Sequence, residues 1–177
     1  VILAQDALAS LLGYTFVQAI SGDNVIRDKS AYKGRIGALV ASETLTVEDD
    51  GTLEGGLNTS TFDAEGTPTR RTLIIENGVL KSYLHDRESA AIFGVAPTGN
   101  ARAWLYDDEP IIRMRNTYLE PGESTLEEMI ASVKDGFLMS GAGNGQADAN
   151  AEFMFGVREA YEIRDGKVGR LMRGASI

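Results

Sequence analysis

Two dipeptides, Asn77-Gly78 and Asp165-Gly166, restrict the possible folds of this chain more than any other feature. They lie inside "RTLIIENGVLKSYLHD" and "EAYEIRDGKVGRLMRG", between segments with the apolar patterning of strands. Asn-Gly and Asp-Gly suit the type I′ turn, whose two central residues need positive φ and which joins adjacent antiparallel strands. The sequence therefore predicts a β-hairpin at each dipeptide.

Apolar spacing predicts about three helices around these hairpins. One covers residues 5–20, where apolar positions recur at helical intervals and form a broad buried face. A short one lies near residues 88–93. The third begins at a capping box formed by Ser124 and Glu127, carries an apolar stripe and ends at Asp135-Gly136.

Further strands are predicted in "ALVASETLTVEDDGT", closed by a turn at Asp50-Gly51, and in "PIIRMRNTYLE". Two more flank "GAGNGQ", which we interpret as a tight glycine turn, and residues 51–70 form a polar loop. About eight strands and three helices predict an α+β fold with a mostly antiparallel sheet.

Composition limits the class of protein. The 177 residues suffice for a single domain, 1–177, and the start at Val1 indicates a fragment of a longer chain. The absence of cysteine excludes disulfides and thiolate metal sites from this chain and fits the cytoplasm. A net charge of −9 argues against direct nucleic-acid binding, and no apolar run is long enough for a membrane span.

The residues offer no complete catalytic site. His85 is the only histidine, so a zinc site or a Ser-His-Asp triad within this chain would depend on it, and a structural role is the more usual one. "GAGNGQ" resembles a phosphate loop only superficially, because a strand-like segment follows it where a helix N-terminus is needed. Its glycines could instead line a groove for a peptide.

Other charged and apolar groups have ordinary explanations. The clusters 48–50 and 107–109 could bind a hard cation, but clustered carboxylates in turns are usually solvated. Arg113 and Arg115 share one strand face and could hold a carboxylate of the protein or of a peptide terminus. The segment "ANAEFMFGVREAY" is either core or a strand edge that pairs with an extended peptide.

Several motifs in order resemble the TldD/PmbA family, also called TldD/TldE and known by the older name modulators of DNA gyrase. They are "LLGYTFVQAISGD", "GRIGALVASETLTVEDDGT", "TGNAR", "RMRNTYLEPGEST", "GQADANAEFMFGVREAYEIRDGKVG" and "RGASI". The resemblance covers essentially the whole chain and corresponds to the front part of the family's β-rich C-terminal domain. It implies a metallopeptidase system in which TldD and TldE subunits pair and act on unstructured peptides.

The resemblance also implies where a zinc site would begin. TldD-type subunits bind zinc through an HExxxH motif on a helix, which would start directly after Leu12. Here Gly13, Tyr14 and Gln18 stand at the first histidine, the glutamate and the second histidine. None of the three supplies the ligand or base of the family motif. The chain therefore resembles the TldE type, although "NAEFMFGVREAYEI" looks more like TldD.

We therefore expect a non-catalytic, TldE-like subunit that holds no zinc itself and has a zinc-bearing TldD-type partner. The candidate residues of its peptide channel are Asn116, Gly145, Gln146 and Asp148. The alternative is a stand-alone peptide- or protein-binding module, or a homodimer, with no peptidase role. A third possibility is catalysis at an unrelated site that uses His85.

Overall fold

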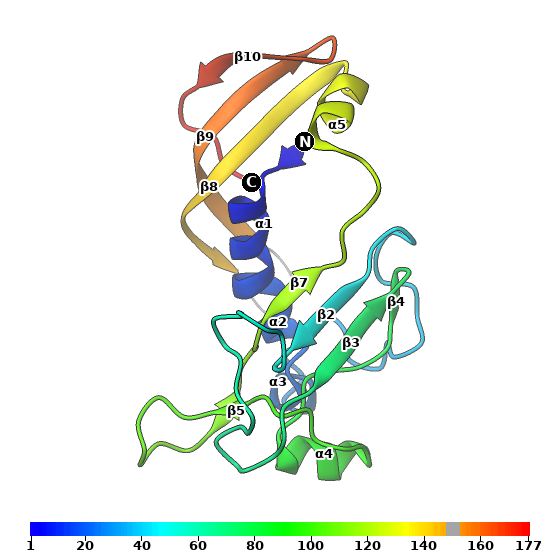
Figure 1. Cartoon of the computed structure of the whole chain (residues 1–177), viewed down its shortest axis with the longest axis vertical. Helices are drawn as coiled ribbons and strands as arrows, with labels where there is room; N and C mark the ends of the chain where they lie inside the picture. Colours follow the sequence, from blue (N-terminus) through cyan, green and yellow to red (C-terminus); the bar gives the residue numbers. More distant parts are fainter. Residues whose placement is uncertain (148–152) are drawn as a thin grey trace. The chain divides into compact units, whose positions relative to one another are not determined.

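A computed structural model describes residues 1–147 and 153–177 of the chain (Figure 1). These residues divide into two compact units, one made of residues 1–15 and 121–177 and the other of residues 16–120. The helices are α1 (Gln5–Leu11), the π-helical η1 (Leu12–Phe16), α2 (Val17–Ala19), α3 (Gly22–Ile26), α4 (Arg87–Phe93) and α5 (Leu126–Ser132). The strands are β1 (Ile2–Leu3), β2 (Val47–Asp50), β3 (Arg71–Glu76), β4 (Val79–Leu80), β5 (Ala101–Arg102), β6 (Ile111–Ile112), β7 (Thr117–Leu119), β8 (Asp135–Ala147), β9 (Phe153–Arg164) and β10 (Lys167–Met172). The predicted α+β class with mostly antiparallel sheets is confirmed.

The unit that contains both ends of the chain is built on a sheet with the order β1-β8-β9-β10. Only β1 pairs in parallel, and the long β8 and β9 run antiparallel from the pair Asp135↔Arg164 onward (Figure 1). Asp165 and Gly166 have φ angles of 46° and 75° between β9 and β10, which confirms the second hairpin. Helix α1 packs against β8.

Helix α5 of the same unit starts one residue later than predicted. Thr125, not Ser124, is the N-cap: its side chain accepts from the Glu128 N–H, and the Glu128 carboxylate accepts from the Thr125 N–H. The helix ends at Ser132, before Asp135 opens β8, and none of its residues is buried. The prediction was shifted because Ser-Thr and Glu-Glu offer two capping boxes in adjacent registers.

The unit of residues 16–120 holds a sheet with the order β4-β3-β2-β7 and a small hairpin, β5-β6. Asn77 and Gly78 have φ angles of 48° and 78° between β3 and β4, so the first hairpin is confirmed. The apolar core of this unit lies between the sheet and α2 and α3. Its buried residues are Val17, Ile20, Val25, Val47, Ile74, Ile75, Leu80, Tyr83, Leu84 and Ile112.

The helix predicted over residues 5–20 is confirmed as a continuous helical segment, formed by α1, η1 and α2 in succession. Three other sequence predictions are corrected by the structure. Strand β2 is restricted to four residues. "PIIRMRNTYLE" forms two strands, β6 and β7, because residues 113–116 turn inward to bond with other segments. The glycines of "GAGNGQ" do not form a turn but continue β8. Among the described residues no helix has the length and apolar character needed to cross a membrane.

Candidate functional site

The positions of the family's metal motif lie on the helical segment that follows β1. This segment changes from the α to the π register at Leu12 and returns to the α register at Val17. A π register connects residues five apart, which is the spacing between Gly13 and Gln18. Such π segments occur frequently at functional sites. The sequence spacing of the family motif is therefore kept, although the ligands themselves are missing.

The side chains at these positions do not fit a zinc ion. Gly13 has no side chain, and Gln18 carries a neutral amide, whereas catalytic zinc is held by imidazole, carboxylate or thiolate groups. Among residues 1–147 and 153–177 no three His, Cys, Asp or Glu side chains are grouped so that they could hold a metal ion. Gly13 and Gln18 therefore do not supply a zinc site.

His85 is built into the core rather than presented to a substrate. It is 3% exposed, and its Nδ1 lies 3.1 Å from the Ser89 hydroxyl. That hydroxyl donates its only hydrogen to Asp86 Oδ1 at 2.7 Å, so it must accept from a protonated Nδ1. Burial lowers the pKa of His85 and favours the neutral ring. Because the Ser89 hydrogen points to a carboxylate and not to the imidazole, these three residues do not form a nucleophile and base pair.

The glycine-rich part of β8 carries two of the predicted channel residues. Gly145 pairs with Phe155, and the register between β8 and β9 shifts between Ala142 and Gly145. A Cβ atom on Gly145 would overlap the Phe155 ring and the Met154 carbonyl, so only glycine fits at this position. Gly145 and Gln146 are both exposed. Asp148, the third predicted residue of this region, lies outside the described residues.

Asn116, the remaining channel candidate, belongs to the other unit and fixes a loop. Its amide nitrogen donates to the Asp50 carbonyl at 2.7 Å and to the Thr59 hydroxyl at 3.1 Å. Its amide oxygen accepts from the Asn58 N–H at 3.0 Å. Both amide hydrogens are therefore used within the protein, and Asn116 holds the loop of residues 51–60 against the ends of β2 and β7.

Sequence reasoning missed a buried polar network centred on Asp49 in β2. Asp49 is 1% exposed and accepts from Thr117 Oγ1 at 2.7 Å, from Asn100 Nδ2 at 2.7 Å and from the Arg115 N–H at 2.9 Å. Burial raises the pKa of Asp49, and the hydrogen bonds that it accepts oppose that rise. No local pattern marks this network, because its donors lie more than fifty residues away in the sequence.

Arg115 and Arg113 do not share a strand face as predicted. Arg115 is 8% exposed and donates from Nε to the Gly99 carbonyl at 2.9 Å. Arg113 is exposed, and its backbone groups alone bond to Asn100. The first arginine is therefore structural, and only the second presents its guanidinium to solvent.

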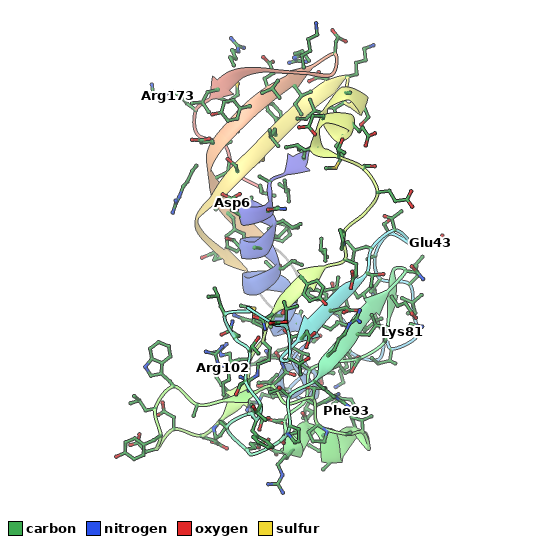
Figure 2. All side chains as sticks on the ribbon, in the orientation of Figure 1. Asp6, Glu43, Lys81, Phe93, Arg102 and Arg173 are labelled. Atoms are coloured by element: carbon green, nitrogen blue, oxygen red, sulfur yellow. The ribbon has the colours of Figure 1, made fainter. Side chains whose placement is uncertain are left out.

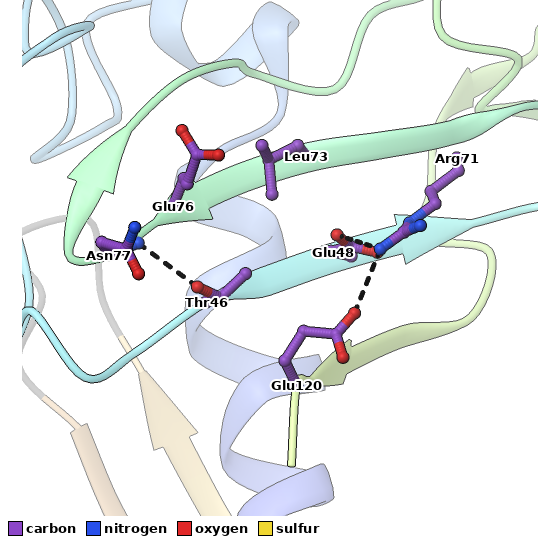
Figure 3. A pocket seen from close by; sticks show the side chains of 7 residues that line it. All are labelled: Thr46, Glu48, Arg71, Leu73, Glu76, Asn77 and Glu120. Carbon is purple, nitrogen blue, oxygen red and sulfur yellow. Dashed lines mark hydrogen bonds and ion pairs between the residues drawn. The ribbon is translucent and has the colours of Figure 1, made fainter. Parts of the chain in front are cut away.

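A polar pocket of about 640 Å³ lies on the β2-β3 surface (Figure 3). Arg71 bridges Glu48 and Glu120 there, with 3.2 Å between Arg71 Nη2 and Glu120 Oε1. The Arg71 hydrogen bond lowers the pKa of Glu48, and burial together with Glu48 raises the pKa of Tyr118 to about 12. The other lining residues are Thr46, Leu73, Glu76 and Asn77. The ion pair with Arg71 keeps Glu48 ionised. The same ion pair uses the Glu48 carboxylate within the protein.

The model of the PmbA/TldA metallopeptidase C-terminal domain matches residues 1–177. The chain belongs to the PmbA/TldD family. It is 39% identical over 160 residues to a metalloprotease of Methanocaldococcus jannaschii, which covers 90% of this chain and 35% of the relative. It is 38% identical over 159 residues to a metalloprotease TldD homolog of Haemophilus influenzae, which covers 89% of this chain and 33% of the relative.

Solved structures of other proteins share the fold of this chain. TldE from Thermococcus kodakarensis is 30% identical with a TM-score of 0.86, over 96% of this chain and 39% of that one. A Thermotoga maritima protein described as a modulator of a DNA gyrase is 29% identical with a TM-score of 0.88, over 99% of this chain and 40% of that one. The chain thus spans between a third and two fifths of the length of these relatives.

Proposed function

We propose that this chain is part of a non-catalytic, TldE-type subunit of a TldD/TldE metallopeptidase that acts on unstructured peptides. The observation that carries the proposal is the pair Gly13 and Gln18 on the π-helical segment, where the family's zinc motif has its histidines. Tyr14 replaces the motif's glutamate, the general base. The spacing of the motif is kept and its chemistry is lost, so the zinc and the base come from a TldD-type partner.

The family assignment supports the metallopeptidase part of this proposal. Relatives are named metalloproteases, and a structure that shares the fold is named TldE. We assign residues 1–177 to one domain, the front part of the family's C-terminal domain, because the family model matches across both compact units. The chain spans 35% of the length of the Methanocaldococcus relative.

The proposed path of the peptide runs along the glycine-rich end of β8. Gly145 and Gln146 are exposed there, and an extended peptide can add to an exposed strand through main-chain hydrogen bonds. Asp148 follows them in the sequence and belongs to the same proposed path. Asn116 stays a channel candidate of the unit of residues 16–120, where its side chain holds the loop of residues 51–60.

We propose that this subunit acts in the cytoplasm and does not bind nucleic acid directly. A chain without cysteine depends on no disulfide and is suited to a reducing compartment. A net charge of −9 repels a phosphate backbone.

The decisive experiment compares the protein alone with the protein copurified with its TldD-type homologue. We expect a heterodimer that contains zinc and cleaves an unstructured peptide, and no cleavage by the protein alone. Stoichiometric zinc together with cleavage by the protein alone would overturn the proposal. A native homodimer that excludes the homologue would favour the alternative, a stand-alone binding module.

A matched variant tests the motif itself. The triple substitution Gly13→His, Tyr14→Glu and Gln18→His restores the family pattern on the π-helical segment, and we expect it to raise the zinc content of the purified protein. The control variant carries Gly13→His alone, which supplies a single ligand and leaves zinc at the level of the unmodified protein. Equal zinc in the triple variant and the control would contradict the role given to these positions.

A further inference from the structure

The hairpin formed by β5 and β6 borders a second cavity, which is open to solvent and separate from the pocket of Figure 3. Its volume is about 550 Å³, within the range of sites for small molecules. Arg102 lies on β5, Arg113 follows β6, and Trp104, Asp108 and Glu109 come from the loop between the strands. Positive groups therefore line the strand side of the cavity, and negative groups line its loop side.

These opposite charges are not paired with one another. Among the described residues no ion pair within 4.0 Å joins either arginine to Asp108 or Glu109, and the Arg113 guanidinium has no hydrogen-bond partner. Arg102 donates to Asn58 Oδ1 at 3.2 Å and keeps other N–H groups free. One oxygen of Asp108 accepts from the Leu105 N–H at 2.9 Å. The cavity thus retains both anion-binding and cation-binding capacity.

Trp104 adds an apolar surface beside these charges. Its side chain is 91% exposed, and the neighbouring Ile111 is 44% exposed. Exposed tryptophan is unusual on a free surface and marks binding sites, because one flat ring buries a large area at little cost in entropy. A ligand that uses the whole cavity carries an anion, a cation and an apolar group.

We propose that this cavity binds a short peptide of two or three residues with both termini free. Its carboxylate lies against Arg113 and Arg102, where charge-assisted hydrogen bonds to guanidinium groups are strong. Its ammonium group faces Glu109 and Asp108, and one apolar side chain packs on Trp104. The proposal is independent of the proposed function, because a stand-alone binding module would carry the same cavity.

The chain has a single tryptophan, which makes the fluorescence of Trp104 a direct probe of this cavity. Titration of the full chain with alanyl-leucine should change that fluorescence and saturate at a dissociation constant of roughly 1 mM, as expected for so small a ligand. The Trp104→Phe variant should lose the signal. The N-acetylated dipeptide and the C-terminal amide, which each lack one charge, should bind at least roughly tenfold more weakly.

Substitution of one arginine separates this site from general charge effects. Arg113→Gln should weaken binding roughly ten- to one-hundredfold, since it removes a charged hydrogen-bond partner. Arg173→Gln, a change of the same type at an exposed arginine of the other unit (Figure 2), should leave binding unchanged. Absence of saturable binding, equal binding of a blocked dipeptide, or equal loss in both variants would overturn the proposal.

Discussion

Two acidic tripeptides of the same composition have opposite fates in this protein. Glu48-Asp49-Asp50 lies in β2 and is buried along its whole length, whereas Asp107-Asp108-Glu109 lies exposed in the loop between β5 and β6. The first receives donors from distant segments. Within the part of the chain that the structure describes, the side chains of the second bond only to their own loop, through Asp108 and the Leu105 N–H. Local composition therefore does not decide whether a carboxylate is solvated. A carboxylate is buried where the fold places hydrogen-bond donors from distant segments around it, as it does around Asp49.

Replacement of Asp49 gives the sharpest test of this contrast. Asp49→Ala leaves the Asn100 amide, the Thr117 hydroxyl and the Arg115 N–H without their acceptor in a buried site. Breaking a buried charged network in this way costs about 3–5 kcal/mol. We expect that decrease in the free energy of unfolding, measured by chemical denaturation. Asp107→Ala is the matched control, and similar losses in both variants would refute the contrast.

The same contrast explains which features the sequence could predict. The hairpins at Asn77-Gly78 and Asp165-Gly166 were predicted correctly because a turn with two positive φ angles depends on its own two residues. The N-cap of α5 was wrong by one residue, because Ser124 and Thr125 are chemically equivalent starts. The two turns and the helix N-cap depend on neighbouring residues, so the local sequence contains most of the information that determines them.

Other features depend on partners far away in the chain. The glycines of "GAGNGQ" suggested a turn, but Gly145 stays in β8 because the Phe155 ring and the Met154 carbonyl of β9 occupy the space of a side chain. The interruption between β6 and β7 follows from bonds of Arg115 to Asp49 and Gly99. The metal-motif positions could be found only through the resemblance to a family, since an apolar helix contains no chemical signal.

The Thr117→Val variant tests how much a single hydrogen-bond donor to buried Asp49 contributes to stability. Valine keeps the shape of threonine and removes only the hydroxyl that donates to Asp49 Oδ1. Loss of one hydrogen bond to a buried charged group should lower the free energy of unfolding by about 1.5–3 kcal/mol. Thr125→Val, which removes an exposed helix cap instead, should cost about 1 kcal/mol. The contrast fails if the exposed site proves the costlier one in denaturation experiments.

The stability that Glu48 contributes through its ion pair with Arg71 should depend on pH. Its pKa is lowered, chiefly by the Arg71 hydrogen bond, so its contribution is present above the unfolded pKa of about 4.3 and is lost as the pH falls through the lower folded value. Glu48→Gln should therefore cost about 1 kcal/mol at pH 7, a value kept small because Arg71 is 59% exposed. The difference between the two proteins should shrink steadily in denaturation experiments below about pH 4.3. A difference that grows toward acid would give the interaction the wrong sign.

The exposed tripeptide should show the smallest effect of all. Asp107→Asn and Glu109→Gln remove charges that have no hydrogen-bond or ion-pair partner among the described residues, and each should change the free energy of unfolding by less than about 0.5 kcal/mol. Asp108→Asn keeps an oxygen that can still accept from the Leu105 N–H, so it should be equally mild. Because Glu109 and Asp108 line the proposed dipeptide cavity, Glu109→Gln and Asp108→Asn should weaken dipeptide binding while stability stays constant. A loss of stability without a loss of binding would mean that the loop acids support the fold, as those of β2 do.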